Sequence, residues 1–97
     1  MSFFFHPLAE QELRESVACY HDISPKLGLT FTQAVQEAIK QAVMFPHAWA
    51  PLTPEIRRVL IHKFPYDLLY QQLEEQIVIL AVMNLNRKPD YWYNRIE

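Results

Sequence analysis

The apolar residues of this 97-residue chain change their period near residue 45, which divides the sequence into a helical half and a strand half. Before that point they recur every three or four positions, as on an amphipathic helix, while polar side chains such as Glu10 and Glu12 fall on the opposite face. The pattern therefore predicts two helices. Their apolar faces contain Leu13, Val17 and Tyr20 in the first helix, and Phe31, Val35, Ala38 and Ala42 in the second.

The segment between the two helices, residues 22–28, contains a Ser-Pro pair and the single glycine of the chain, Gly28. We expect the chain to reverse there, with Gly28 in the left-handed conformation that ends many helices. Thr30 followed by Gln33 matches a capping box and predicts the start of the second helix. Two helices joined by a short turn form an antiparallel hairpin that can lie across one face of a sheet.

Residues 57–64 alternate between two faces and predict the first of three consecutive strands. Val59 and Ile61 should point to one face, and Leu60, His62 and Phe64 to the other. The proline that follows has no amide donor and a fixed φ, so it interrupts the ladder of hydrogen bonds. We therefore expect residues 63–66 to form the tight corner of an antiparallel hairpin.

The second strand is predicted over residues 66–73, where Tyr66 and Tyr70 share one face and are expected to lie in the core. After a polar turn, residues 77–83 are apolar without interruption and rich in β-branched side chains. Such a run is typical of a strand that is buried on both faces. The short apolar run at residues 2–6 is expected to add a further strand to the same sheet.

Two remaining segments complete the predicted fold. Residues 45–54 contain three prolines and should form an irregular connection, with the ring of Trp49 tucked beneath it. Residues 90–95 should form a short C-terminal helix or turn, with Asp90 as its N-cap or as an ion-pair partner of Arg95. The prediction is an α+β fold in one domain, residues 1–97. An N-terminal strand and an antiparallel helical hairpin precede a three-stranded antiparallel meander, and the helices cover one face of one small sheet.

Composition narrows the classes of function. The net charge of −2 argues against a protein that binds nucleic acid over its whole surface, although most basic residues lie in the second half of the chain. Cys19 is the single cysteine, and no His, Cys or carboxylate spacing matches a metal site, so we expect no metal and no cofactor. No apolar run is long enough to span a membrane and no export signal is evident, so we expect a cytoplasmic protein without membrane contact.

The order of the predicted elements and a series of short motifs resemble one family, the RelE/ParE superfamily of toxins from type II toxin–antitoxin modules. The resemblance spans nearly the whole chain, and its most specific parts are the Phe-Pro-Tyr corner and the Arg-x-Pro-x-Tyr-Trp-x-x-Arg ending. Relatives with this ending often have a histidine three residues before the first arginine, where this chain has Asn84. The matching residues are Glu12-Leu13, Tyr20, Leu27-Gly28-Leu29, Phe31, Pro46, Ile56-Arg57-Arg58, Phe64-Pro65-Tyr66, Tyr70, Ile79-Leu80-Ala81-Val82, Arg87-Lys88-Pro89-Asp90-Tyr91-Trp92 and Arg95.

The resemblance implies a small growth-inhibiting toxin that a co-encoded antitoxin holds inactive. Antitoxins of such modules typically wrap a flexible C-terminal segment over the toxin and bind their promoter through another domain, so the toxin would meet DNA only indirectly. Ordering a flexible segment costs entropy, which an extended apolar contact surface must offset. The helical hairpin and the sheet edge are the expected contact surface. One branch of the superfamily cleaves messenger RNA in the ribosome, and the other poisons DNA gyrase without being a nuclease.

A metal-free ribonuclease would need cationic groups for the phosphorane and a nearby acid or base. The candidate catalytic residues, relevant only to that alternative, are Arg87, Tyr91, His62 and Lys63. For a gyrase inhibitor the same end of the chain would serve target binding, and the candidates are Arg57, Arg58, Arg87, Tyr91, Trp92 and Arg95. Each also has a structural interpretation: strand arginines commonly keep an edge soluble, and a tryptophan near the C-terminus can cover the end of a sheet.

Charge helps to choose between the two branches. A protein that inserts into ribosomal RNA gains affinity from many phosphate contacts, and this chain is slightly acidic. We therefore favour a non-nucleolytic toxin that binds DNA gyrase, which would make it a binding protein rather than an enzyme. A ribosome-dependent mRNA endoribonuclease stays open as the alternative, because catalysis depends on a few well-placed groups rather than on net charge.

Overall fold

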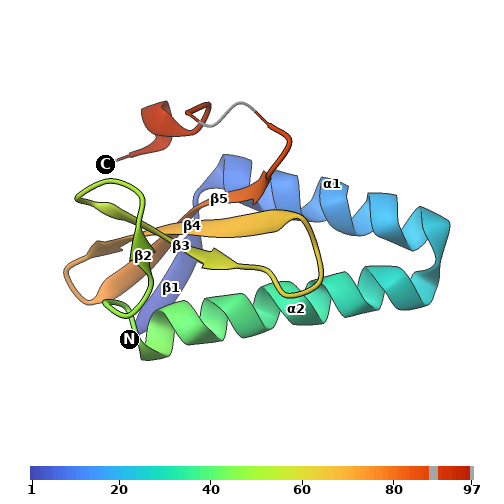
Figure 1. Ribbon diagram of the computed structural model, residues 1–97, viewed down its shortest axis with the longest axis horizontal. Helices are drawn as coiled ribbons and strands as arrows, with labels where there is room; N and C mark the ends of the chain where they lie inside the picture. Colours follow the sequence, from blue (N-terminus) through green and yellow to red (C-terminus); the bar gives the residue numbers. More distant parts are fainter. Residues whose placement is uncertain (88–89, 97) are drawn as a thin grey trace.

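A twisted sheet forms the centre of the molecule, and two antiparallel helices lie against one of its faces (Figure 1). The computed structural model describes residues 1–87 and 90–96. Within these residues the five strands follow the order β1-β5-β4-β3-β2, with β1 parallel to β5 and the other pairs antiparallel. The elements are β1 (Ser2–Phe5), α1 (Pro7–Ile23), α2 (Pro25–Met44), β2 (Ala50–Pro51), β3 (Ile56–Leu60), β4 (Tyr66–Leu73), β5 (Gln76–Asn84) and the 3-10 helix η1 (Tyr93–Arg95). The predicted α+β architecture is confirmed.

The reversal between the helices is sharper than predicted. Ser24 alone separates α1 from α2, and its side chain accepts a hydrogen bond from the Leu27 backbone N–H as the N-cap of α2. The predicted capping box at Thr30 is therefore wrong, because that residue lies inside α2 and its hydroxyl donates to the Lys26 carbonyl. Gly28, four residues after this cap, also differs from its prediction.

Gly28 lies within α2 and has no positive φ, so the predicted left-handed conformation is wrong as well. It is buried where α2 approaches α1, and a Cβ atom added there would lie 2.9 Å from Cβ of His21 and 3.0 Å from its Cα. The absence of a side chain thus lets the two helices approach closely at the closed end of the hairpin.

The hairpin between β3 and β4 also differs from the alternating pattern. β3 ends at Leu60, and residues 61–65 form the turn, in which Lys63 adopts a φ of 71°. Strand alternation between two faces requires an extended backbone, so it does not continue through this turn. Phe64 therefore packs with Tyr20 and Phe31 on the helix side, each ring centroid 5.0 Å away, and not on the face predicted for it.

The proline-rich connection includes a strand that the sequence pattern did not predict. Ala50 and Pro51 form β2, which pairs with β3 at the edge of the sheet, where a proline is tolerated. The expected position of Trp49 is confirmed: its ring packs against the core and its indole N–H donates to the Gln41 carbonyl at 3.1 Å.

The sheet has a core on each side. Tyr66 and Tyr70 belong to the core beneath the helices, as predicted. The opposite face carries a second, smaller core that the C-terminal segment, defined here as residues 90–96, covers through Trp92. In Figure 1 this segment lies across the sheet from α2. Leu80 and Ala81 both enter the second core because a bulge interrupts the pairing of β5 with β4.

No helix among the described residues has the length and apolar character needed to cross a membrane.

Candidate functional site

The place where β1 ends creates an unpaired stretch on the edge of β5, and the candidate site is built there. The last register pair of the two strands joins Phe5 to Ile79. Beyond it, the Val82 N–H donates to the carboxylate of Glu12 at 3.1 Å, and the Leu80 carbonyl accepts from the guanidinium of Arg95 at 3.0 Å. Side chains from α1 and from the C-terminal segment thus replace the missing strand, since buried backbone groups need partners.

The same two side chains form a buried ion pair. Arg95 Nη1 and Nη2 lie 2.9 and 3.1 Å from the two carboxylate oxygens of Glu12, a bidentate geometry, and both side chains are largely buried. The prediction that Arg95 pairs with Asp90 is therefore wrong. The prediction that Glu12 lies on the solvent face of the first helix is also wrong. The pair joins residues 83 positions apart, so no local pattern could have identified it.

The ring of Tyr91 contacts two guanidinium groups. The Cζ atoms of Arg87 and Arg95 are 4.3 and 5.0 Å from the centroid of its ring, which is the geometry of a cation–π contact. Burial of the hydroxyl, with the Glu12 carboxylate beside it, raises the pKa of Tyr91 well above its usual range, although both arginines oppose the shift. The phenol is therefore uncharged at neutral pH.

The candidate residues of the C-terminal segment differ in exposure. Trp92 is 1% exposed and Arg95 is 8% exposed, so both are occupied within the fold, whereas Arg87 and part of Tyr91 face solvent. Lys88, which belongs to the basic residues of this ending, lies outside the described residues. Of the predicted target-binding residues at this end of the chain, Arg87 and Tyr91 are thus the ones whose side chains reach solvent.

A pocket of about 200 Å³ opens beside these two side chains. The remaining residues that line it come from α1 and from the ends of β4 and β5: Glu12, Glu15, Ser16, Cys19, Tyr66, Val82 and Asn84. The side chain of Asn84 accepts a hydrogen bond from the Asn86 backbone N–H at 2.9 Å. At the position where relatives often have a histidine, this chain therefore has a residue that caps the turn leading to Arg87.

His62 and Lys63 lie at the same end of the sheet but do not line this pocket. They occupy the exposed turn between β3 and β4, and the carbonyl of Pro65 in that turn accepts a hydrogen bond from the Leu85 N–H. The structure therefore brings His62 and Lys63 to the same end as Arg87 without placing them in one cavity.

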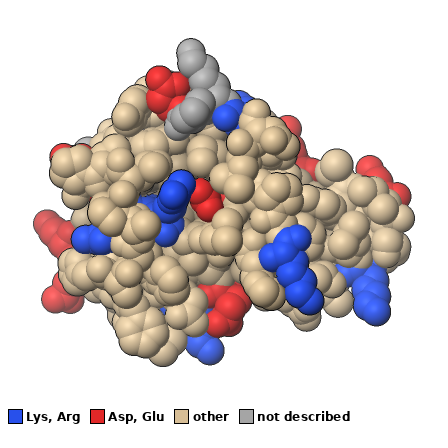
Figure 2. Space-filling view, viewed as in Figure 1, with Lys and Arg blue, Asp and Glu red and all other residues tan. Residues whose placement is uncertain are grey.

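Arg57 and Arg58 point to opposite faces of β3, and neither forms a hydrogen bond or ion pair with the described C-terminal segment, residues 90–96. Arg57 donates to the Trp49 carbonyl at 2.7 Å, and Arg58 lies 3.5 Å from the carboxylate of Asp67. Burial raises the pKa of Asp67, and the nearby Arg58 guanidinium opposes this shift. Figure 2 shows basic side chains in small separate groups on the face it presents, with acidic groups between them.

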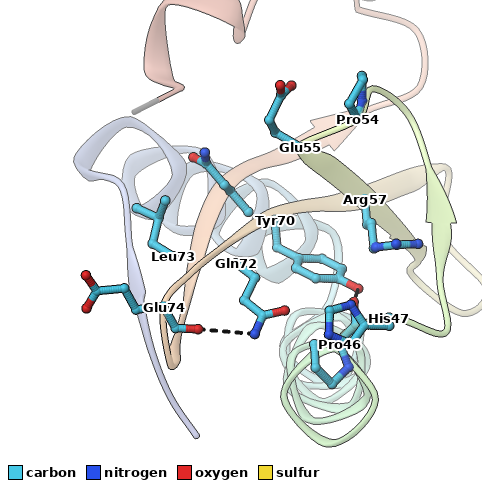
Figure 3. Close-up of a pocket in the computed structure, with 10 residues that line it drawn as sticks. Pro46, His47, Pro54, Glu55, Arg57, Tyr70, Gln72, Leu73 and Glu74 are labelled. Atoms are coloured by element: carbon cyan, nitrogen blue, oxygen red, sulfur yellow. Dashed lines mark hydrogen bonds between the residues drawn. The ribbon is translucent and has the colours of Figure 1, made fainter.

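A larger pocket, of about 580 Å³, lies beside Arg57 (Figure 3). Its floor includes Tyr70, whose hydroxyl donates to the Pro46 carbonyl at 2.7 Å and whose pKa is raised to about 12 by burial, partly offset by Arg57. Two glutamates and one histidine stand on its rim as well, so its charge is mixed. Within the described part of the chain, no group of three or more His, Cys, Asp or Glu side chains could hold a metal ion.

The helical hairpin on one face of the sheet and the Arg-Tyr-Arg cluster at its end agree with the resemblance to RelE/ParE toxins that the sequence motifs indicated. The sequence is 34% identical over 89 residues to Toxin ParE2 of Mycobacterium tuberculosis, in both the CDC 1551 and H37Rv strains. The match covers 88% of this chain and 82% of that protein. The chain therefore belongs to the ParE family of toxins.

The fold agrees with this assignment. A chain from the chromosomal ParDE toxin–antitoxin system of P. aeruginosa superposes with a TM-score of 0.76 over 89% of this chain and 97% of that chain. The sequence identity is 20%, so this likeness supports the fold and not a particular target. No model of a protein family matches the sequence.

Proposed function

We propose that this ParE toxin inhibits growth in the cytoplasm by binding DNA gyrase, and that its C-terminal end, with Arg87 and Tyr91, is the recognition surface. The observation that carries the proposal is the cluster on Tyr91, where two guanidinium groups contact one aromatic ring. Arginine and tyrosine are the side chains most often found at the energetic centre of a protein interface. The membership in the ParE family agrees with gyrase as the target.

The nuclease alternative has one specific observation in its favour, because Arg87 and Tyr91 line a common pocket with Tyr66. Its proposed proton donors, His62 and Lys63, do not line that pocket, and the Tyr91 hydroxyl is buried with a raised pKa. A general acid or base works best with a pKa near the operating pH. These features favour binding over RNA cleavage.

Expression of the chain from a tight promoter, with Arg87→Ala as the control, tests the target. The proposal expects arrested growth, intact messenger RNA and loss of plasmid supercoiling within minutes, and loss of these effects in the variant. Cuts in messenger RNA that follow the reading frame and vanish in the variant would contradict it and establish the nuclease. Inhibition of supercoiling by purified gyrase in the presence of the toxin is the direct confirmation.

For the antitoxin we propose a contact surface at β1, on the same edge of the sheet but toward the start of β5, away from Arg87 and Tyr91. β1 is an edge strand whose outer side has no partner among the described residues, and an apolar groove of about 360 Å³ lies between it and α2. An extended apolar segment can add to such an edge and place alternate side chains in the groove. The groove is lined by Met1, Phe3, Gln36, Ile39, Lys40, Val43 and Met44.

The two neighbouring phenylalanines of β1 give a matched test of this surface. Phe3 is 47% exposed and lines the groove, whereas Phe4 is 43% exposed and does not line it. We expect Phe3→Asp to weaken binding of the co-encoded antitoxin roughly tenfold or more in calorimetric titration, and Phe4→Asp to have a much smaller effect. Equal losses in the two variants would contradict a contact in the groove.

A further inference from the structure

The C-terminal segment has little regular structure of its own to hold it in place. The backbone hydrogen bonds of its described residues stay within the segment, from Tyr93 to Asp90, from Arg95 to Trp92 and from Ile96 to Tyr93. Its polar contacts with the rest of the described chain converge on Glu12 and on the neighbouring Leu80 carbonyl. One carboxylate on α1 thus provides most of the directional attachment of this segment.

Apolar burial attaches the segment too, but without fixing its orientation. Trp92 fills the second core, and the hydrophobic effect that holds it there is non-directional. The bidentate pair of Arg95 with Glu12 has fixed distances and a fixed plane, and it is anchored a second time on the backbone of β5. The ion pair therefore adds a directional restraint on the angle at which the segment lies against α1 and β5.

That angle matters for the residues that face solvent. The guanidinium groups of Arg95 and Arg87 both contact the ring of Tyr91, and the Tyr91 hydroxyl lies beside Glu12. A contiguous series of contacts thus runs from Glu12 through Arg95 and Tyr91 to Arg87. A shift at its first member would displace the exposed guanidinium at its end.

We propose that Glu12, which lies on α1 and outside the C-terminal segment, is the positioning residue of the toxic surface. Its carboxylate holds Arg95, and through Arg95 it fixes Tyr91 and Arg87 in the orientation that contacts the target. The inference rests on the proposed function, because it assigns the recognition surface to this end of the molecule. The inference assigns a role in target recognition to Glu12, a residue that contacts no target itself. The helical pattern of the sequence had placed Glu12 on the solvent face.

Glu12→Gln is the sharpest perturbation because it preserves the shape of the side chain. One oxygen of Glu12 accepts from both Val82 and Arg95, and the other accepts from Arg95. The amide oxygen of glutamine can still accept the hydrogen bonds of the first oxygen. The amide NH₂ group then replaces the second oxygen and faces the Arg95 guanidinium, so that two hydrogen-bond donors oppose each other. Glu10→Gln is the matched control, since it removes the same charge from the exposed face of the same helix, outside the pocket and without touching Arg95.

The experiment combines three measurements on the full chain. Trp92 becomes the sole tryptophan in a Trp49→Phe background, and acrylamide quenching of its fluorescence reports whether the segment stays attached. Circular dichroism shows that the variant is folded. Growth arrest and antitoxin affinity, measured with the native tryptophans, separate a local loss of the toxic surface from a general loss of structure.

The proposal expects quenching of Trp92 to increase about threefold in Glu12→Gln through local opening of the segment, and not in Glu10→Gln. The inducer needed for growth arrest should rise roughly tenfold, while antitoxin affinity, which depends on the groove between β1 and α2, should stay within about twofold. Parallel loss of toxicity and antitoxin affinity would indicate a merely structural role and overturn the proposal. Unchanged quenching and toxicity would overturn it as well.

Two further outcomes are distinguishable. If Glu12→Gln does not fold, Glu12→Asp keeps the charge at a shorter reach and should show the same split between toxicity and antitoxin affinity to a smaller degree; equal toxicity in Asp and wild type would refute the positioning role. If the wild-type chain does not arrest growth, the proposed function fails, while the quenching of Trp92 still decides whether Glu12 holds the segment.

Discussion

Replacement of Gly28 by alanine tests how tightly the helical hairpin is packed, because two opposing effects are of similar size. Alanine is favoured over glycine in a helix interior by about 1 kcal/mol, so helix propensity alone predicts a more stable protein. In this structure the new methyl group would lie 2.9 Å from Cβ and 3.0 Å from Cα of His21. Carbon atoms in contact prefer about 3.5–4.0 Å, so the helices must separate by several tenths of an ångström or more.

The clash cannot be relieved by a side-chain rotation, since the atoms it meets are the Cα and Cβ of His21, which are fixed to the backbone of α1. Overpacking of this kind costs about 1–3 kcal/mol, which exceeds or cancels the propensity gain. We expect a net loss of about 1 kcal/mol in the free energy of unfolding, with a fall in Tm of roughly 4–8 °C for a domain of this size.

Urea denaturation followed by circular dichroism measures this change directly. Ala18→Gly, at an exposed position of α1, is the control for propensity and should lose about 1 kcal/mol by itself. If Gly28→Ala were stabilised by the amount that propensity predicts, the close approach of the helices described here would be refuted.

Three further predictions concern the buried polar groups. Arg95→Met should destabilise the protein by about 3–5 kcal/mol because it leaves the Glu12 carboxylate buried without its counter-ion. The double variant Glu12→Leu with Arg95→Met should recover only part of that loss in a double-mutant cycle of urea midpoints, because the Val82 N–H and the Leu80 carbonyl then lose their side-chain partners. Tyr70→Phe should cost about 1 kcal/mol in the same assay, since it removes the hydrogen bond to the Pro46 carbonyl. Burial raises the pKa of Asp67 above its unfolded value of 3.8, so the fold is more stable with the neutral carboxyl than with the carboxylate. This stabilisation is fully present below pH 3.8 and is lost as the pH rises through the folded pKa. Asp67→Asn should therefore raise Tm at pH 7, and this gain should disappear in thermal scans below pH 4. A gain that persisted in acid would contradict the assigned cause.

The periodic parts of the sequence determined the elements of this protein. A helical period before residue 45 and continuous or alternating apolar residues after it each depend on one face being buried, and that requirement is written locally in the chain. The helices, the strands of the meander and the N-terminal strand could be predicted for this reason. The same holds for the family, since the Phe-Pro-Tyr corner and the arginine-rich ending are contiguous motifs.

The tertiary structure alone decided which residues meet. Gly28 serves a close helix contact rather than a turn, and Phe64 packs on the helix side because it lies in a turn where strand alternation has ended. Glu12, which the helical period assigns to solvent, becomes the partner of Arg95 because β1 ends early and leaves backbone groups of β5 unpaired. Such pairings depend on the three-dimensional path of segments far apart in the chain, and a local period carries no information about that path.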